Sequence, residues 1–287
     1  MQIVTDRGCD FSQEQLAKIK VHFVPMRLTL DGKTYSSGVD ITPEEFYDLL
    51  SSTDSYPTTS QATVGDFESL YRELAKTDPD ILSIHISSGL SGTINSAKAA
   101  AANVPEARVT IVDTKTLSCA EAWQVEAAYR AVQAGLPLDK ILNLLSQISQ
   151  ATEGMFTLDT LKYLIHGGRI SHLKGLIASM LNIKPVIGVE KELGKYYTLA
   201  QEITMKRAVK KLAQVLTRFF PEGSAVRVQM VHGKNPEAID LLRSALLELF
   251  QVHWLPTLSV APILGAHTGA GVVGVIAGPQ ELFSTLP

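Results

Sequence analysis

The amino-acid sequence predicts an α/β protein with two domains. The chain has 287 residues, a length at which a single hydrophobic core usually divides. In the first half, short apolar runs alternate with segments that carry helix-start signals, which is typical of βαβ units and a mostly parallel sheet. Beyond about residue 155 the pattern changes to short helices, a Gly-Gly break and two apolar runs that can pair as a hairpin. This change favours a second domain with a mixed sheet.

Helix-start signals in the first half are specific. Ser12 and Gln15 have the spacing of a capping box, and Thr42 and Glu45 repeat it with Pro43 at the first helical position. Strands are expected at residues 2–6, 80–86 and 108–113. Further helices are expected at residues 94–104, 117–134 and 138–150. These elements predict an N-terminal domain of residues 1–155 with a Rossmann-like parallel sheet and flanking helices.

The second half predicts a C-terminal α/β domain of residues 156–287 with a mixed sheet. Its elements are a hairpin that turns near Gly194, helices at 203–219 and from Pro236, and strands at 225–233 and 271–278. The last strand contains VVGVIA at residues 272–277. We expect this segment to fill the core, with the lining of a tunnel as the alternative. No low-complexity linker joins the halves, so a packed interface between them is expected.

Composition excludes several function classes. With 26 basic and 29 acidic residues the net charge is −3, which argues against a nucleic-acid footprint. No apolar run reaches membrane-span length, and the start MQIVTDRGCD is not a signal peptide, so a cytoplasmic protein is expected. Cys9 and Cys119 are expected to be buried, inert thiols. The seven histidines include no close pair at ligand spacing, so no metal site is expected.

The stretch HISSGLSGTINSA at residues 85–97 is the first candidate site. Four hydroxyl side chains lie between the end of an expected strand and the start of an expected helix: Ser87, Ser88, Ser91 and Thr93. Ligands of open parallel sheets bind at this edge, and helix amino ends favour anions. Glycines at 89 and 92 allow close approach of the backbone. One hydroxyl suffices to cap a helix, so four indicate an anion site.

Covalent chemistry and nucleotide binding are less favoured at this loop. The residue two after Ser91 is Thr93, so the G-x-S-x-G elbow of a hydrolase is absent. A phosphate-binding G-x-x-x-x-G-K-[ST] loop and a strand-linked G-x-G-x-x-G are also absent. A hydrolase that uses Ser91 with His267 stays open as an alternative, although the sequence names no third member of a triad. A binder of another small anion is a further alternative.

Three other stretches carry similar chemistry. PTTSQAT at residues 57–63 is interpreted as a polar loop rich in hydroxyls. HGGRIS at 166–171 places Arg169 behind two glycines, and GAHTGAGVVG at 265–274 places His267 and Thr268 in a glycine-rich turn. Singly, each is more often a plain turn, and a lone histidine is usually structural.

Together, the motifs resemble the DegV family of bacterial fatty-acid-binding proteins. The ordered set is TDRGCD at 5–10, TSQ at 59–61, SSGLSGT at 87–93, LKYLIHGGRIS at 161–171, LNIKPVI at 181–187 and HTGAGVVG at 267–274. Two positions depart from the family pattern. Arg7 stands where the family usually has serine, and Ala270 replaces a proline. Arg7 is expected to alter the rim of the pocket, and Ala270 to loosen the final turn.

The resemblance implies a two-domain α/β protein that buries one long-chain fatty acid, such as palmitate, between its domains. It implies that Thr59 and Ser91 hold the carboxylate, with His267 and Thr268 near the head group. The same motif loops place Ser60, Gly92 and Thr93 at the ligand. Residues expected to set the acyl chain length include Leu164, Ile177 and Met180. No cofactor is implied other than the bound acid.

The resemblance also implies a partner. In the family an ATP-dependent fatty-acid kinase phosphorylates the bound carboxylate, and the binding protein carries the acyl phosphate to phospholipid synthesis. The chain would then be a lipid carrier and not an enzyme, with transient contact to a membrane or an acyltransferase. Arg169 is implicated in the work with the kinase, because its fork geometry suits phosphate charge. Neutral hydroxyls would orient the carboxylate without a permanent ion pair.

Overall fold

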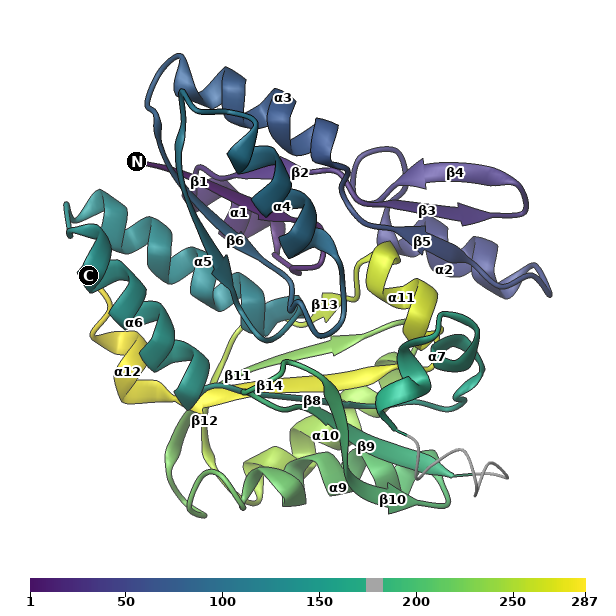
Figure 1. The fold of residues 1–287 in the computed structure, drawn as a ribbon. Coiled ribbons are helices and arrows are strands. Elements are labelled where there is room, and N and C mark those ends of the chain that lie inside the picture. The colour runs from purple at the N-terminus through teal and green to yellow at the C-terminus, as the bar shows by residue number, and fades with distance from the viewer. Residues whose placement is uncertain (174–182) are drawn as a thin grey trace.

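Helical layers and β-sheets alternate through the protein (Figure 1). The computed structural model describes residues 1–173 and 183–287. Helices α3 (Val64–Ala75) and α4 (Thr93–Ala102) pack on one face of a first sheet. Helices α5 (Ser118–Gln133) and α6 (Leu138–Ala151) lie between that sheet and a second one (Figure 1). The largest hydrophobic core joins both sheets through this middle helical layer.

The first sheet is fully parallel, with the strand order β2-β1-β6-β7. Its strands are β1 (Gln2–Asp6), β2 (His22–Val24), β6 (Asp80–His85) and β7 (Arg108–Asp113). The strand order reverses between β1 and β6, and the carboxyl ends of strands at such a reversal are where ligands bind in open sheets. The α/β class and the Rossmann-like parallel sheet are therefore confirmed. The loop that contains Ser91 follows β6 at this edge.

Both predicted capping boxes form. In α1 (Gln13–Lys18) the Ser12 hydroxyl accepts from the backbone N–H of Gln15, whose side chain accepts from the Ser12 N–H. In α2 (Pro43–Ser51) Thr42 and Glu45 do the same. The side-chain oxygens thus satisfy N–H groups that the first turn of a helix leaves without partners.

A small antiparallel sheet, with the order β4-β3-β5, extends the first half. Its strands are β3 (Arg27–Leu30), β4 (Lys33–Ser36) and β5 (Thr58–Ser60). The interpretation of residues 57–63 as a loop is therefore wrong for β5, which pairs with β3. Its three polar residues are too few to show the alternation by which a strand is recognised.

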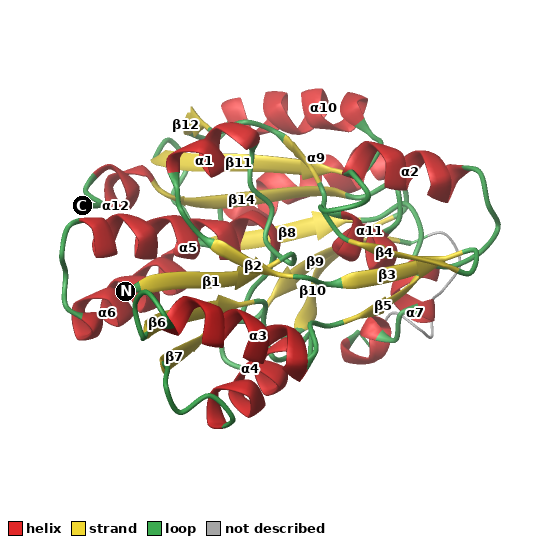
Figure 2. Ribbon diagram, turned by 90° about the horizontal axis from the view of Figure 1, so that it is seen from above, coloured by secondary structure: helices red, strands yellow, loops and turns green. Residues whose placement is uncertain are grey.

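The second sheet is mixed and has the order β10-β9-β8-β14-β11-β12, with β13 also paired to β11. The strands are β8 (Glu153–Thr157), β9 (Lys184–Val189), β10 (Tyr196–Glu202), β11 (Ala225–His232), β12 (Gln251–Trp254), β13 (Leu258–Ser259) and β14 (Val273–Pro279). Helices α9 (Met205–Leu216) and α10 (Pro236–Leu247) pack on its outer face (Figures 1 and 2). The predicted hairpin of β9 and β10 forms, and Gly194 has a φ of 66° in its turn.

The halves of the chain interlock. Residue 155 falls inside β8, whose partners β14 and β9 both belong to the second sheet. We propose that the domain division lies at the start of β8, close to the expected residue 155. From the second half, α11 (Pro262–Thr268) packs against α2 and β3 of the first half. The fold thus brings residues from both halves to one edge of the first sheet.

Three short helical segments complete the structure. Helix α7 (Lys162–His166) and the 3₁₀ helix η1 (Arg169–His172) contact each other and carry the HGGRIS motif. Helix α12 (Gln280–Ser284) follows β14. No helix in the described part of the chain combines the length and the apolar character that a membrane span needs.

Candidate functional site

A pocket at the carboxyl edge of the first sheet gathers residues from distant motifs. This polar pocket encloses about 450 Å³, including the space that opens to solvent. It is lined by Met26, Thr59, Ser60, Gln61, Ile86, Leu90, Ser91, Leu117, Arg169, Tyr196, Ile263, Leu264 and His267. Three of the motifs singled out in the sequence therefore meet the SSGLSGT loop in space.

The SSGLSGT loop is held by the hairpin of the second sheet. The Ser87 hydroxyl donates to the backbone oxygen of Gly194 at 2.8 Å. A Cβ added at Gly89 would lie 2.4 Å from the Leu193 carbonyl oxygen, so only glycine fits there. Farther along the loop, the Ser91 and Thr93 hydroxyl oxygens lie 2.9 Å apart, and the Thr93 N–H donates to Ser91 Oγ. Ser91 is thus fixed at the start of α4.

Thr59 and His267 are joined across the interface between the two halves. Thr59 lies on β5 and His267 in the last turn of α11, and Thr59 Oγ1 shares a hydrogen bond of 2.8 Å with Nε2 of the imidazole. The expectation that His267 and Thr268 lie in a turn is therefore wrong, because the helix continues to Thr268 and the turn begins at Gly269. The other ring nitrogen of His267 is buried and has no hydrogen-bond partner among the described residues.

The electrostatics of the polar pocket keep His267 neutral. Burial lowers the pKa of His267 to about 4, and the nearby charges of Arg169 and His166 act in the same direction. At neutral pH the imidazole therefore carries one proton and can serve both as a donor and as an acceptor. Arg169 is then the cationic side chain in the lining of the polar pocket.

Arg169 is oriented by two backbone carbonyl groups. Its Nε donates to the Leu90 oxygen at 3.2 Å, and Nη1 donates to the Gly167 oxygen at 2.7 Å. Gly168 has a φ of 75°, in the left-handed region that glycine adopts without strain. The Gly-Gly break thus turns the chain so that the guanidinium reaches the SSGLSGT loop.

Five of the predicted site residues line the polar pocket, and three lie beside it. Thr59, Ser60, Ser91, Arg169 and His267 line the polar pocket together. The other three predicted residues lie next to it but outside its lining: Gly92, Thr93 and Thr268. Gly92 approaches the Gln61 side chain, the buried Thr93 hydroxyl pairs with Ser91, and Thr268 donates to the Leu264 oxygen.

Among the lining residues that were not predicted, two carry polar groups: Gln61 and Tyr196. Gln61 lies in the quoted TSQ motif, and its exposed amide donates to the Ser96 hydroxyl at 3.0 Å. Tyr196 comes from β10, and burial raises its pKa above the ordinary value. The motif could have pointed to Gln61. Tyr196 carried no signal, because its role follows only from the packing of the hairpin against the first half.

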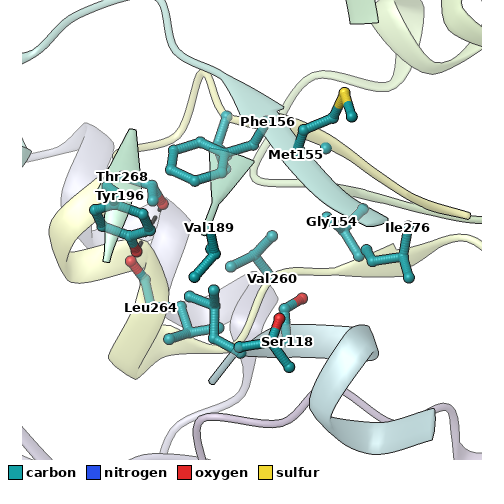
Figure 3. Close-up of a pocket in the computed structure, with 15 residues that line it drawn as sticks. Ser118, Gly154, Met155, Phe156, Val189, Tyr196, Val260, Leu264, Thr268 and Ile276 are labelled. Atoms are coloured by element: carbon teal, nitrogen blue, oxygen red, sulfur yellow. Dashed lines mark hydrogen bonds between the residues drawn. The ribbon is translucent and has the colours of Figure 1, made fainter. Parts of the chain in front are cut away.

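An apolar cavity, shown in Figure 3, adjoins the polar pocket. It encloses about 480 Å³, including space that opens to solvent, and it shares the residues Leu117, Tyr196 and Leu264 with the polar pocket. Its other lining residues are Thr116, Ser118, Gly154, Met155, Phe156, Val189, Val231, Val260, Thr268, Val272, Gly274 and Ile276. The hydroxyl-lined pocket and the apolar cavity therefore adjoin at the three shared side chains.

The VVGVIA segment serves both of the purposes weighed from the sequence. Val272, Gly274 and Ile276 line the apolar cavity, whereas Val273, Val275 and Ala277 pack in the core under α9 and α10. Side chains of a strand alternate between the two faces of a sheet, so a continuous apolar run can fill both sides.

The described lining of the two spaces confirms none of the three residues expected to set the acyl chain length. Leu164 is fully buried in the main core and lines neither the polar pocket nor the apolar cavity. Ile177 and Met180 lie outside the described residues.

The hydrogen bonds do not form a catalytic triad. The Ser91 hydroxyl pairs with Thr93, while His267 pairs with Thr59 and, among the described residues, receives no orienting acid on its second nitrogen. Cys9 and Cys119 are buried free thiols, as expected, and burial raises the pKa of each. The described residues also contain no group of three or more metal-ligating side chains.

Comparison with known proteins identifies the family. A relative from Staphylococcus aureus (strain N315), a DegV domain-containing protein, is 33% identical over 274 residues, which are 96% of this chain and 97% of the relative. The structure of a fatty-acid-binding DegV family protein from Thermus thermophilus matches with a TM-score of 0.85 and 28% identity, over 97% of this chain and 99% of that one. DegV, a fatty acid binding protein from Bacillus subtilis, matches with a TM-score of 0.87 and 25% identity, over 97% and 99% of the two chains. The family profile described as "Uncharacterised protein, DegV family" matches residues 1–280, and the chain belongs to the DegV family.

Proposed function

We propose that the protein binds one long-chain fatty acid, with the carboxylate in the polar pocket and the acyl chain in the apolar cavity. The observation that carries this proposal is that a polar and an apolar space lie side by side and share the lining residues Leu117, Tyr196 and Leu264. The solved structures from Thermus thermophilus and Bacillus subtilis, both of fatty-acid-binding proteins, support it.

The two ends of the site contribute differently to binding. Burial of about 14 methylene groups at about 0.8 kcal/mol each contributes on the order of 10 kcal/mol before ordering costs. The polar pocket then orients the head group. The Thr59 and Ser91 hydroxyls donate hydrogen bonds to the carboxylate, while the neutral imidazole of His267 donates to Thr59 and so leaves the Thr59 proton to the ligand. Arg169 supplies the positive charge.

We further propose that the protein presents the carboxylate to a fatty-acid kinase. Ser60 and Gln61 in the lining are exposed, so the head-group end of the site faces solvent. The carboxylate oxygen would attack the γ-phosphorus of ATP on the kinase, with ADP as the leaving group. Arg169 lies where it would stabilise the phosphate charge. A cytoplasmic carrier of the acyl phosphate to phospholipid synthesis, in brief contact with a membrane or an acyltransferase, is the role that follows.

Native mass spectrometry of the purified protein tests lipid binding. We expect an added mass that corresponds to one long-chain acid. The double variant Thr59→Ala with Ser91→Ala should lose most of this load, because two donors to the carboxylate are removed. Thr58→Ala with Ser88→Ala is the matched control, since both residues flank the site but lie outside its lining. A full load of acid in the first double variant would contradict the proposal.

A separate assay tests the kinase step. Protein loaded with acid is incubated with ATP and a candidate kinase, and acyl phosphate is trapped with hydroxylamine. Arg169→Ala, saturated with an excess of acid so that its occupancy equals that of the native protein, is expected to lose at least 10-fold in phosphorylation rate, because the charge on the transferred phosphoryl group is no longer matched. An unchanged rate would remove Arg169 from this role while leaving lipid binding intact.

A further inference from the structure

A second cleft lies at the carboxyl end of β1, apart from the polar pocket. This cleft, here called the Arg7 cleft, encloses about 760 Å³, including space that opens to solvent. Its walls include Arg7, Phe11, Phe23, Val39, Ile41 and Pro262. None of its lining residues lines the polar pocket or the apolar cavity. A ligand of this cleft would therefore be a second ligand.

Arg7 is a fixed cation without a counter-charge. Its guanidinium carbon lies 4.1 Å from the centroid of the Phe23 ring. A Cβ added at Gly38 would lie 3.3 Å from Nη1, so the turn at Gly38 holds the other side of the group. The Nε atom is buried and has no hydrogen-bond partner among the described residues. No ion pair of Arg7 forms within the described part of the chain.

This situation differs from that of Arg27 and Arg227, which are also partly or fully buried. Arg27 pairs with Asp66 at 2.8 Å, and Arg227 pairs with Glu126 at 3.0 Å. Burial lowers the pKa of Arg7 from its ordinary value, yet a guanidinium stays protonated in proteins. A desolvated charge that no carboxylate compensates is costly, and an anion from solution would reduce the cost.

The acidic side chains near the cleft are already occupied. Asp10 lines the cleft, but one of its oxygens accepts from the Ala261 N–H at 2.8 Å and the other from the Ser118 hydroxyl at 2.5 Å. Glu44 accepts from the Ser259 hydroxyl at 3.1 Å. Neither carboxylate forms an ion pair with Arg7 among the described residues, which leaves the guanidinium available to a ligand.

We propose that the Arg7 cleft binds a small organic anion, with a carboxylate or phosphate group on Arg7 and an apolar group against the cleft walls. The fork of the guanidinium matches either oxyanion in a bidentate geometry. The apolar group is inferred from the walls, because Phe11 and Phe23 contact each other edge to face at 6.3 Å and the neighbouring Val39 side chain is 69% exposed. A phosphate or sulfate ion alone would leave these surfaces in water.

Isothermal titration calorimetry with four probes tests the inference: benzoate, phenyl phosphate, inorganic phosphate and benzamide. We expect saturable binding of benzoate or phenyl phosphate, at least 10-fold weaker binding of inorganic phosphate, and no binding of neutral benzamide. The tighter of the first two probes tells whether a carboxylate or a phosphate is preferred. Absence of saturable binding by both organic anions, or equal binding of benzamide, overturns the inference.

Variants locate the site. Arg7→Gln keeps much of the side-chain stem and is expected to weaken binding at least 10-fold, while the fatty-acid load measured by mass spectrometry stays unchanged. Arg169→Ala is the matched control, because it removes a cation from the polar pocket and should leave the probe affinity as it is. In the native protein, the Gly38 amide signal should shift on titration with the probe in NMR spectra. Binding that survives Arg7→Gln, or that is lost in Arg169→Ala, overturns the assignment.

Discussion

The polar pocket and the apolar cavity meet at three shared side chains but are built in different ways. The polar pocket depends on single contacts between segments that lie far apart in the sequence, such as the bond of Thr59 to His267 and the two carbonyl bonds of Arg169. The apolar cavity is lined mainly by strands that already pair with each other, as Met155 of β8 and Ile276 of β14 do. The head-group end is thus specific and sensitive to small shifts, whereas the tail end tolerates changes of volume.

The largest expected effect comes from a methyl group at the head-group end. A Cβ at Gly167 would lie 2.0 Å from His267 Nδ1, and the Gly167 φ of −74° allows alanine without backbone strain. In Gly167→Ala, His267 must therefore move away from Thr59. Loss of one hydrogen bond to a charged ligand and of the Thr59 bond costs about 3 kcal/mol, or about 100-fold in affinity for the acid.

Gly65→Ala is the control for this prediction. A Cβ at Gly65, on the helix α3, would lie 3.9 Å from Thr63 Oγ1, so the substitution should be neutral or stabilise by about 0.5–1 kcal/mol. Acid affinity in both variants is measured after delipidation by titration with a fluorescent fatty acid. Equal affinity in the two variants would show that the head-group end is not the sensitive one.

At the tail end, a change of volume should alter chain-length preference while binding persists. Val260 lines the apolar cavity and is almost fully buried (Figure 3). Val260→Phe fills space that about two methylene groups would occupy, at about 0.8 kcal/mol each. Longer acids should therefore bind about 15-fold more weakly relative to shorter ones. Val260→Ala should shift the preference toward longer acids.

Mass spectrometry of the acids that copurify with each variant measures this shift. The total load should stay near one acid per protein in both, and the distribution of chain lengths should move in opposite directions. If both variants lost the acid entirely, the tail end would be as sensitive as the head-group end, and the contrast between the two regions would fail.

Sequence patterns predicted regular elements better than they predicted the site. The capping boxes at Ser12 and Thr42 and the strands of the parallel sheet depend on local spacing, so they could be recognised. The strand at Thr58–Ser60 could not, because it forms only through pairing with β3. The helix that ends at Thr268 has no capping side chain at its start. Without that signal, the glycines of this segment favour a turn over a helix.

The composition of the polar pocket was predictable only where motifs mark it. Thr59, Ser91, Arg169 and His267 belong to quoted motifs, and the structure brings all four together. Tyr196 does not belong to one, and its position follows from the docking of the β9–β10 hairpin against the first half. Contacts between distant segments, which build the head-group end, are what local patterns do not encode.

Substitution of Asp10 tests whether the polar pocket and the apolar cavity both depend on helix α11. It accepts from the N–H of Ala261, which precedes α11, and α11 contributes Leu264 to both spaces and His267 to the polar pocket. Asp10→Ala leaves two partly buried donors unpaired, so it should lower the free energy of unfolding by about 2 kcal/mol and weaken acid binding. Urea denaturation and acid titration check this. Intact affinity would show that α11 is held by its other contacts.

Asp10→Asn separates the charge of this residue from its hydrogen bonds. Burial raises the pKa of Asp10 from 3.8 to about 6. The folded state therefore binds more protons than the unfolded state in this range, and stability is present below pH 3.8 and lost as the pH rises through about 6. Asparagine keeps a hydrogen-bond acceptor but cannot ionise, so the variant does not lose stability as the pH rises through 6. Its stability relative to the native protein should rise by about 1 kcal/mol between pH 5 and pH 8, as measured by urea denaturation.

The smallest expected effect concerns the proton on His267. Burial lowers its pKa from the ordinary value of 6.5 to about 4, so the unfolded state binds more protons between these values. The stability that His267 contributes is therefore present above pH 6.5 and falls as the pH drops toward 4. An anion in the polar pocket favours the charged imidazole and raises its pKa. Ligand binding should then take up protons, and affinity should rise about 2- to 3-fold from pH 7 to pH 5.

A long-chain alkyl sulfonate is the appropriate probe for this effect, because its head group stays ionised over the whole range whereas a carboxylate would itself gain a proton. Calorimetry in two buffers with different ionisation enthalpies measures the proton uptake directly. His267→Gln keeps a donor and an acceptor near Thr59 and should bind the sulfonate with an affinity that does not change with pH. Arg169 stays charged over this pH range, so it cannot cause the effect. If the affinity of His267→Gln still changed with pH, the titrating group would be another residue, and the bond between His267 and Thr59 would not explain the pH dependence.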